Sequence, residues 1–347
     1  MKVARHSLTS AFLGLTALVA GALCSAPASA DDSATFFKDK TVRIIVGFGP
    51  GGGYDAYARM LAPYFKEALG AAGVIVENQP GAGGISALNR LYVAPPDGLA
   101  MMLIQGTGAA MQQLLGQSAV RFDLAKVGYL GIVSASPWMW LVTPKSPIHA
   151  AADAFKPGVK LSWPGSGPID GLSDGAAITC YTLKLDCKVV RGYKGSAAAA
   201  LAVAQGEMDA IYVSDTSANH YVQAGNGRAI AAMGRVRSRF FKDVPTIFEA
   251  VKLDADQQWW FDFRATLDDL GRVLVLPPGL SKERLAFLQE AARKVLTNRT
   301  LIDEGEKKQR YVDYVDPEKT RAKVLHVVSG LSPERKALVR EVILKKY

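Results

Sequence analysis

Short apolar strands alternate with helical segments along most of this chain, and this alternation limits the fold more than any other feature. The first strand is expected at Thr41–Val46, a β-branched run bounded by glycine, and two more at 73–77 and 100–104. Helical periodicity fills the intervals 54–69 and 84–92. A β-α-β-α-β order predicts a parallel sheet with right-handed crossovers.

A similar set of elements returns later, so we expect two α/β units. Strands are expected at 159–163, 188–190, 210–214 and 229–233, and helices at 171–183 and 197–205. The strand-like stretch 129–142 is interpreted as the crossing between units. We expect the fold class α/β. Residues 31–140 should form the first part of lobe 1, residues 141–236 should form lobe 2, and residues 237–347 should return to lobe 1 and end in C-terminal helices. Ser281, Asp316 and Ser332 are predicted to start C-terminal helices.

The N-terminus has the organisation of a secretory signal peptide. Lys2 and Arg5 precede a short apolar stretch at 11–23, and Ala28-Ser29-Ala30 forms an A-x-A cleavage site. We predict a signal peptide over 1–30, export through the general secretory route, and a periplasmic location. A short membrane anchor is the alternative. No later apolar run reaches about 18 residues, so we expect no further membrane span.

Export to an oxidising compartment favours a disulfide between Cys180 and Cys187, the two cysteines beyond the signal peptide. On one continuous helix their Cα atoms would be about 10 Å apart, too far for a disulfide. The chain must therefore turn between them, near Leu185 and Asp186. Two separate buried thiols are the alternative.

Glycine-rich loops connect several strands to the helices that follow. Residues 47–55 (GFGPGGGYD) form the first, 78–84 (NQPGAGG) the second, and Gly106-Thr107-Gly108 the third. Such loops bring bare backbone N–H groups and a partly positive helix N-terminus to one edge of an open sheet. Their convergence favours a small anion such as a carboxylate. Asp55 is predicted to cap the first helix.

Other kinds of site fit less well. Gly47, Gly49 and Gly52 satisfy G-x-G-x-x-G, but Pro50 removes an N–H that a dinucleotide pyrophosphate would need. The histidines have no metal-ligand spacing, and no G-x-S-x-G nucleophile motif occurs. The formal charge of +9 includes no tight basic cluster, so nucleic acid is not an expected partner.

The chain resembles the Bug (TctC-like) periplasmic solute-binding proteins of tripartite tricarboxylate transporters. The matching segments are KTVRIIVGFGPGGGYD, VENQPGAGG, APPDG, GYKGSAAAALAVAQGEMDAIYVSD and DVPTIFEA. The resemblance implies a two-lobe type II periplasmic binding protein fold with the ligand cleft between the lobes. It also implies that backbone amides of the first two glycine-rich loops hold a ligand carboxylate.

By position, the resemblance assigns the ligand site to both lobes. The lobe 1 residues are Phe48, Gly51, Gly52, Gly53, Tyr54, Gly81, Ala82, Gly83 and Gly84. Thr107, in the third glycine-rich loop, is a further candidate from the loop pattern alone. The lobe 2 residues are Gly165, Ser166, Gly167, Tyr193, Gly195, Ser196 and Asp215. Tyr54 replaces a small hydroxyl residue common in the family, and Pro168–Gly171 replaces a Ser-rich stretch, so pocket size and distal contacts should differ.

These observations predict a periplasmic protein that binds a small carboxylate and delivers it to the membrane subunits of a tripartite tricarboxylate transporter. We expect a monomer without cofactor, metal or catalytic residues. A binding protein for a sensor or another transporter class is the first alternative. A periplasmic hydrolase is the second.

Overall fold

The first sheet combines the predicted strands with one that arrives from the far end of the chain. In this computed structural model, which describes residues 33–347, β1 (Thr41–Val46) pairs in parallel with β2 (Gly73–Asn78) and β3 (Ala100–Gln105). β10 (Arg272–Leu276) lies between β3 and β4 (Gly128–Ser134), antiparallel to both. The predicted parallel sheet is therefore confirmed for its three strands, and β10 is a strand that the sequence did not predict. That strand returns from the other lobe and enters in the opposite direction.

The second lobe contains two smaller sheets. β5 (Trp138–Val142) is central and runs antiparallel to β8 (Ala210–Ser214) and β9 (Arg228–Ala232). β6 (Lys160–Gly165) and β7 (Asp186–Arg191) form a parallel pair. The stretch predicted as a crossing is thus β4 and β5, one strand in each lobe, joined by residues 135–137.

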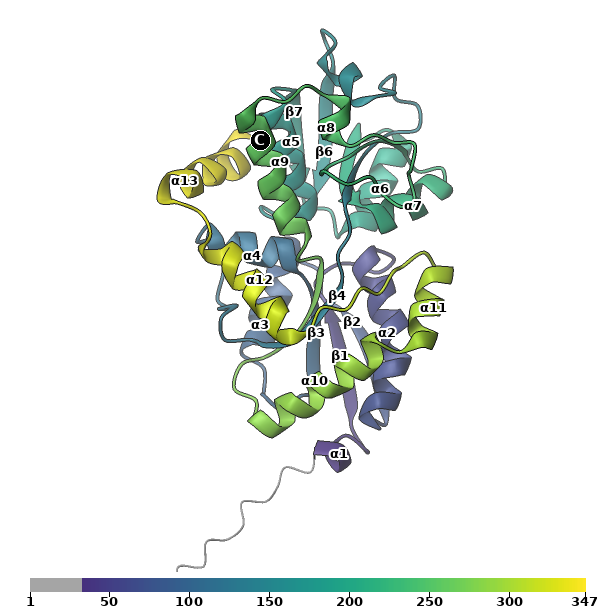
Figure 1. The fold of residues 1–347 in the computed structure, drawn as a ribbon, viewed down its shortest axis with the longest axis vertical. Helices are drawn as coiled ribbons and strands as arrows, with labels where there is room; N and C mark the ends of the chain where they lie inside the picture. The colour runs from purple at the N-terminus through teal and green to yellow at the C-terminus, as the bar shows by residue number, and fades with distance from the viewer. Residues whose placement is uncertain (1–32) are drawn as a thin grey trace, which may run out of the picture. The chain divides into compact units, whose positions relative to one another are not determined.

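Helices cover both sets of strands (Figure 1). They are α1 (Ser33–Phe36), α2 (Gly53–Leu69), η1 (Ala82–Gly84), α3 (Ile85–Tyr92), α4 (Gly106–Leu114), η2 (Ala151–Phe155), α5 (Gly171–Thr182), α6 (Ser196–Gln205), α7 (Asp215–Gln223), α8 (Ile247–Ala250), α9 (Ala255–Asp268), α10 (Lys282–Leu296), α11 (Arg299–Lys307), α12 (Pro317–Ser329), α13 (Pro333–Glu341) and η3 (Val342–Lys346). Ser281, Asp316 and Ser332 each accept a first-turn N–H of the helix that follows, which confirms the three predicted starts.

The C-terminal third divides between the lobes. α10 packs on α2, and α12 packs on β4 and α4, as expected for a return to lobe 1. α9 instead contacts both α4 and α5, and η3 packs on α5 of the second lobe (Figure 1). The predicted division into domains, at 31–140, 141–236 and 237–347, stays a prediction. The contacts of α9 and η3 place part of the last segment on lobe 2.

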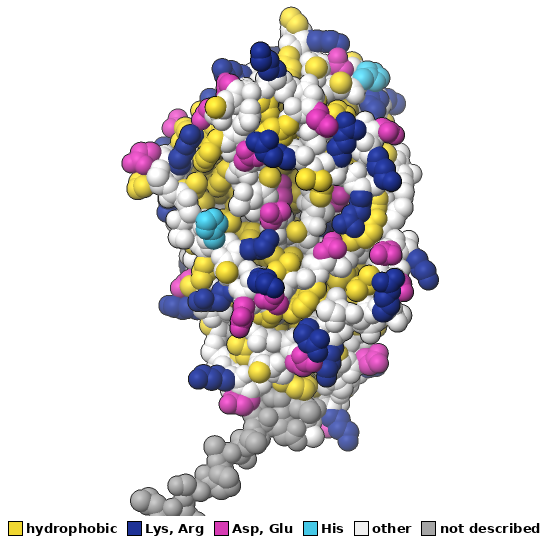
Figure 2. All heavy atoms as spheres, in the orientation of Figure 1, with side chains coloured by type: hydrophobic (Ala, Val, Ile, Leu, Met, Phe, Trp, Pro, Cys, Tyr) yellow, Lys and Arg dark blue, Asp and Glu magenta, His cyan; other side chains and the backbone are white. Residues whose placement is uncertain are grey.

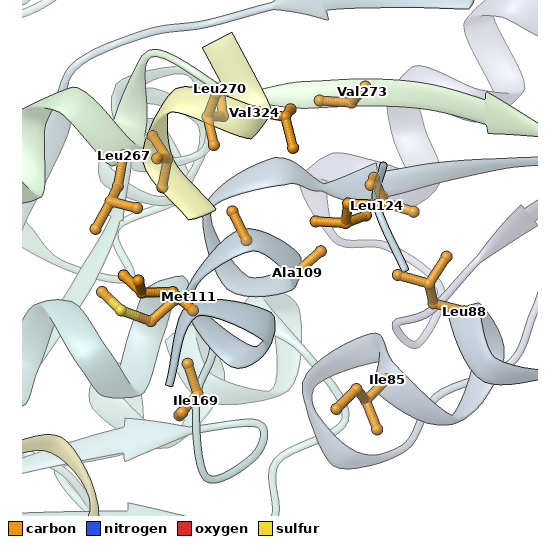
Figure 3. Packing of buried hydrophobic residues seen from close by; sticks show 14 of the residues in the cluster. Ile85, Leu88, Ala109, Met111, Leu124, Ile169, Leu267, Leu270, Val273 and Val324 are labelled. Atoms are coloured by element: carbon orange, nitrogen blue, oxygen red, sulfur yellow. The ribbon is translucent and has the colours of Figure 1, made fainter. Parts of the chain in front are cut away.

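One apolar cluster continues from lobe 1 into the loop before α5. Figure 3 shows Ile169 beside Met111 of α4, with Leu267 of α9 nearby. All three side chains are buried. The backbone carbonyl of Ile169 also accepts a hydrogen bond from the Gln112 side chain at 2.8 Å. The lobes are therefore packed against each other along α4.

The predicted Cys180–Cys187 disulfide is confirmed, with the Cα atoms 6.0 Å apart. The chain turns between α5 and β7, where Lys184 has a left-handed φ of 54°. The predicted signal peptide over 1–30 lies outside the described residues. Within 33–347 there is no helix of the length and apolarity needed to span a bilayer. Lys and Arg side chains are scattered among acidic ones on the face in Figure 2.

Candidate functional site

A small cavity lies between the lobes, where several strands end and helices begin. Lobe 1 contributes the loop before α2, the end of β3 and the start of β10, while lobe 2 contributes β5, α5, α6, β8 and α7. The lining residues of this inner cavity are Phe48, Gly52, Gly53, Tyr54, Gln105, Trp138, Leu172, Ser196, Val213, Ser214, Ser217 and Arg272.

The lobes are close together around the inner cavity. Its volume is about 30 Å³, room for about two water molecules. Gly49 of lobe 1 donates its N–H to the Lys194 carbonyl of lobe 2 at 2.6 Å. A Cβ on Gly167 would lie 2.5 Å from the Gly83 nitrogen, so only glycine fits where these two loops meet. A carboxylate of several carbons therefore requires the walls to move apart.

Several helix N-termini point at the inner cavity. Gly53 is the first residue of α2 and Ser196 the first of α6, while Leu172 and Ser217 lie in the first turns of α5 and α7. The first N–H groups of a helix have no partner within it, and they concentrate about half a positive charge at that end. The cavity is therefore suited to a negative group.

A buried arginine adds a full positive charge to the same cavity. Arg272, at the start of β10, is 3% exposed. Its guanidinium donates to the hydroxyls of Ser134 at 3.3 Å, Ser214 at 3.1 Å and Thr216 at 3.2 Å. The ring of Tyr57 lies 4.3 Å from it. Arg272 is not among the residues predicted from the sequence, although a lone arginine directly before the apolar run VLVL is a signal of a buried charge.

Aromatic side chains form much of the remaining wall. Phe48 and Tyr54 pack with ring centroids 5.1 Å apart, and Trp138 stacks on Tyr212 at 5.4 Å. Burial raises the pKa of Tyr54 to about 12, although the Arg272 guanidinium favours the ionised form. The Tyr54 hydroxyl therefore keeps its proton at neutral pH.

The predicted ligand residues line different spaces, and Phe48 borders each of them. Gly52, Gly53, Tyr54 and Ser196 line the inner cavity with Phe48. An outer pocket of about 280 Å³ is lined by Gly47, Phe48, Pro80, Gly81, Ala82, Gly83, Ser166, Gly192, Tyr193 and Lys194. Gly83 and Gly84 also border a third, mainly apolar space of about 10 Å³ beside Phe48 and Gln105. The two glycine-rich loops approach closely at Gly47 and Gly84, where a Cβ on Gly47 would lie 2.7 Å from the Gly84 Cα, and the Asn78 side chain donates to the Phe48 carbonyl at 3.0 Å.

The glycine loop of lobe 2 holds one of the protein's own carboxylates. Asp170, directly before α5, accepts the N–H groups of Ser166 at 3.1 Å and Gly167 at 2.8 Å. The same side chain accepts the Leu172 N–H at 2.8 Å as the helix cap. These donors already have an anionic partner. The loop at 165–171 is therefore an anion-binding turn that Asp170 fills.

Asp55 of lobe 1 also binds a backbone N–H of a glycine-rich loop. The prediction that Asp55 caps the first helix is wrong. The cap residue of α2 is Gly52, and Asp55 lies in the first turn. Its carboxylate accepts the Gly51 N–H and the Arg59 Nε, both at 3.0 Å. Burial opposes ionisation, but Arg59 and this N–H outweigh it and lower the pKa of Asp55. The Gly51 N–H is therefore already bonded within the protein.

The other predicted residues have partners within the protein. Thr107 donates to the Leu267 carbonyl at 2.8 Å and joins α4 to α9. Asp215 accepts from Ser238 at 2.9 Å, and burial raises its pKa. Tyr193 donates to Glu207 at 2.7 Å. Gly165 accepts the N–H groups of residues 192 and 193, and Gly195 precedes α6 with a φ of 131°.

Comparison with known proteins agrees with this architecture. The sequence profile of the family described as "Tripartite tricarboxylate transporter family receptor" matches residues 57–327. The chain is 27% identical over 281 residues to a UPF0065 protein of Bordetella pertussis, covering 80% of this chain and 82% of that protein. It is 26% identical over 275 residues to the protein BugT of the same organism, covering 77% of this chain and 81% of that protein.

The fold of this chain also resembles that of solved structures, including two that cover most of its length. One is the periplasmic binding protein BugD, with a TM-score of 0.73 and 21% identity over 88% of this chain and 98% of that one. The other is Rpa4515 of R. palustris with adipate, with a TM-score of 0.72 and 18% identity over 87% and 97%. The fold is thus the two-lobe periplasmic binding protein fold predicted from the sequence. Because the profile covers most of the chain, the protein belongs to the TctC family of tripartite tricarboxylate transporter receptors.

Proposed function

We propose that this protein is a periplasmic solute-binding protein that captures a small carboxylate between its lobes. It delivers the ligand to the membrane subunits of a tripartite tricarboxylate transporter, acts as a monomer, and performs no catalysis. The structural neighbour with bound adipate supports a carboxylate as the ligand class. Family membership supports the transporter as the destination.

The inner cavity is the observation on which this proposal rests. Its lining combines the N-termini of α2, α6 and α7 with a buried guanidinium, and both features attract a negative group. The carboxylate sits at the start of α2, against Gly52, Gly53 and Tyr54. Phe48 and Ser196 flank it.

The remaining predicted residues close the cleft around the ligand. Gly81–Gly84 face Gly165–Gly167, and Tyr193–Gly195 lie across from Phe48 and Gly49. A tight mouth of this kind sequesters a ligand once the lobes meet.

The local hydrogen bonds disfavour a dinucleotide in the first glycine-rich loop. The N–H groups of Gly49 and Gly51 are already bonded to Lys194 and Asp55. Among residues 33–347, no cluster of three or more His, Cys, Asp or Glu side chains could hold a metal ion. A receptor for a sensor or another transporter class would use the same cleft, and genomic neighbours encoding one large and one small membrane subunit distinguish the transporter.

A thermal-shift screen of organic acids and amino acids on the mature protein tests the proposal. A ligand present at about 100 times its Kd adds about 2.7 kcal/mol to stability, a clear rise in Tm. If no acid raises Tm and calorimetry finds no binding, the proposal is wrong. Turnover of a bound acid would instead support a hydrolase.

A glycine variant then tests closure of the cleft. Gly83 has a φ of 67°, and a Cβ there would lie 2.9 Å from the Ile169 carbonyl oxygen of the facing loop. Gly83→Val should hold the lobes apart and weaken binding by about tenfold or more. Gly206→Val is the control, because Gly206 has a φ of 79° and nothing within 4 Å of its Cβ position. Equal affinities in the two variants would show that the mouth is not part of the site.

A further inference from the structure

The inner cavity contains a buried guanidinium, that of Arg272, which forms no ion pair with the residues that the structure describes. We propose that Arg272 is the receptor for the ligand's anionic group, and that the ligand is a monocarboxylate with a compact apolar body. This inference rests on the proposed function and narrows it, from a small carboxylate to one class and one principal binding residue.

The neighbours of Arg272 accept hydrogen bonds from it but form no ion pair with it. Its three hydrogen-bond acceptors are the hydroxyls of Ser134, Ser214 and Thr216, all neutral groups. Its Nε is buried and has no acceptor among the described residues. Within 33–347 the guanidinium also forms no ion pair. Asp215, which lies between Ser214 and Thr216 in sequence, is near enough for the guanidinium to favour its ionised form, but its carboxylate accepts a hydrogen bond from Ser238. A buried charge without a partner is costly, so an anion entering here gains strongly.

The backbone around Arg272 increases the positive potential. The Cβ position of Gly53, the first residue of α2, lies 3.1 Å from a terminal nitrogen of Arg272. Ser214, which accepts from the guanidinium, is the residue before α7. The partly positive N-termini of α2 and α7 therefore lie close to the positively charged guanidinium of Arg272, which is unfavourable without an anion. A carboxylate placed between them is attracted by all three.

Arg272 also lies where the chain crosses between the lobes. It pairs with Ser134, the last residue of β4, directly before the crossing to β5. The preceding residue, Gly271, has a φ of 47°, and its Cβ would overlap the Ser134 carbonyl oxygen. From this position the guanidinium reaches Ser134 of lobe 1 and Ser214 of lobe 2. An anion bound to it is therefore held at the hinge, where both lobes contribute donors.

The rest of the cavity determines the class of ligand. Its other walls are the side chains of Phe48, Trp138, Leu172 and Val213 and the ring of Tyr54, and Gln105 is the main additional polar side chain away from the hydroxyls. The lining contains one cationic side chain and no second one. A second carboxylate would be buried against aromatic and aliphatic carbon without a counter-charge, which is unfavourable. An apolar body instead gains by leaving water.

Calorimetry with benzoate, and with its neutral isostere benzamide, tests the role of Arg272. The parent protein should bind benzoate more tightly than benzamide, malate and citrate. Arg272→Gln should weaken benzoate binding by about 100-fold, the usual scale for removing one member of a buried charge pair. Benzamide binding should change by less than about threefold. A purely structural role for Arg272 would weaken both ligands equally.

A matched arginine controls for loss of folding. Arg228→Gln removes a half-buried guanidinium that donates to the carbonyls of residues 144, 146 and 148 of lobe 2, and it should leave the benzoate affinity unchanged. Arg272→Lys retains the charge and should recover part of the benzoate affinity.

The outcomes distinguish this inference from the proposed function. If malate or citrate binds the parent more tightly than benzoate, or if Arg272→Gln keeps its preference for benzoate over benzamide, the inference is wrong and carboxylate capture stands. If no acid binds the parent protein, both are wrong.

Discussion

Two arginines are buried where the lobes meet, and one is surrounded by carboxylates while the other is hydrogen-bonded to neutral hydroxyls. Arg264 of α9 forms ion pairs with Asp174 of α5, at 3.2 Å, and with Asp268. Its guanidinium lies 5.2 Å from the ring of Trp138, which also lines the inner cavity. Arg272 has only hydroxyl acceptors among the residues that the structure describes.

We interpret this difference as that between a structural arginine, Arg264, and a ligand-binding one, Arg272. Two carboxylates around one guanidinium leave an excess of negative charge, and burial accordingly raises the pKa of Asp174 to about 7 and of Asp268 to about 8, although Arg264 opposes both shifts. The Arg264 cluster can therefore become neutral by holding one proton. The hydroxyls bonded to Arg272 cannot neutralise it in this way, so we expect its charge to be balanced from outside.

Replacing each arginine with methionine is the strongest test of this contrast. Arg264→Met leaves two buried carboxylates without a cation, and we expect the free energy of unfolding to fall by about 3–5 kcal/mol. Arg272→Met removes an uncompensated buried charge, so the unliganded protein should keep its stability or gain some, while binding is lost. Urea denaturation of both variants without ligand measures this. Equal losses would remove the distinction.

Two glycine substitutions test the same contrast through packing. A Cβ on Gly175 of α5 would lie 2.3 Å from the ring of Tyr212, which packs against Arg264. Gly175→Ala should therefore destabilise the protein by about 1–3 kcal/mol. A Cβ on Gly53 would lie 2.6 Å from the Ser217 hydroxyl, on the wall of the inner cavity.

Gly53→Ala should affect ligand affinity more than stability, because it fills space that the carboxylate needs. Thermal denaturation measures the stability of Gly53→Ala and Gly175→Ala, and calorimetry measures the ligand affinity of each. If Gly53→Ala destabilises the protein as much as Gly175→Ala and leaves affinity intact, the cavity wall is ordinary core.

The Arg264 cluster also predicts a pH dependence of stability. Asp268 and Asp174 titrate near pH 4 in the unfolded chain, and the folded cluster retains a proton to about pH 7–8. Between pH 4 and pH 8 the folded state thus binds more protons than the unfolded state. The stabilisation that this proton gives the folded state is complete below pH 4 and is lost as the pH rises to 8. The slope is at most about 1.4 kcal/mol per pH unit for one proton. Urea denaturation of the parent and of Asp268→Asn at pH 5, 6, 7 and 8 should show a flatter profile in the variant. Parallel profiles would contradict a retained proton.

The sequence predicted the fold better than the site because the two depend on different kinds of information. Strand positions such as 41–46 and 210–214 follow from local apolar runs, and both are confirmed. The Cys180–Cys187 disulfide followed from the expected oxidising compartment and from the two cysteines that remain beyond the signal peptide. β10 joins the first sheet antiparallel, a result of long-range topology that a local run cannot specify.

The composition of the inner cavity depends on residues brought together from distant segments. Arg272 meets Ser214, 58 positions earlier, only after the chain has crossed between the lobes. Glycine-rich loops were visible as potential donors, but Asp170 and Asp55 occupy several of their N–H groups, and that pairing appears only in three dimensions. A motif can therefore indicate an anion site without showing which anion fills it.

The smallest expected effect concerns the hydroxyl of Tyr54. Tyr54 packs its ring on Phe48 and lies 5.2 Å from the Arg272 guanidinium. Tyr54→Phe keeps the ring and the positive charge and removes one hydroxyl, so benzoate binding should weaken only about two- to fivefold. Because burial raises the pKa of Tyr54 to about 12, this difference should stay constant from pH 6 to 9. Calorimetry on parent and variant at both ends of that range measures it. A loss as large as that of Arg272→Gln would mean that the hydroxyl, and not the guanidinium, dominates recognition of the anion.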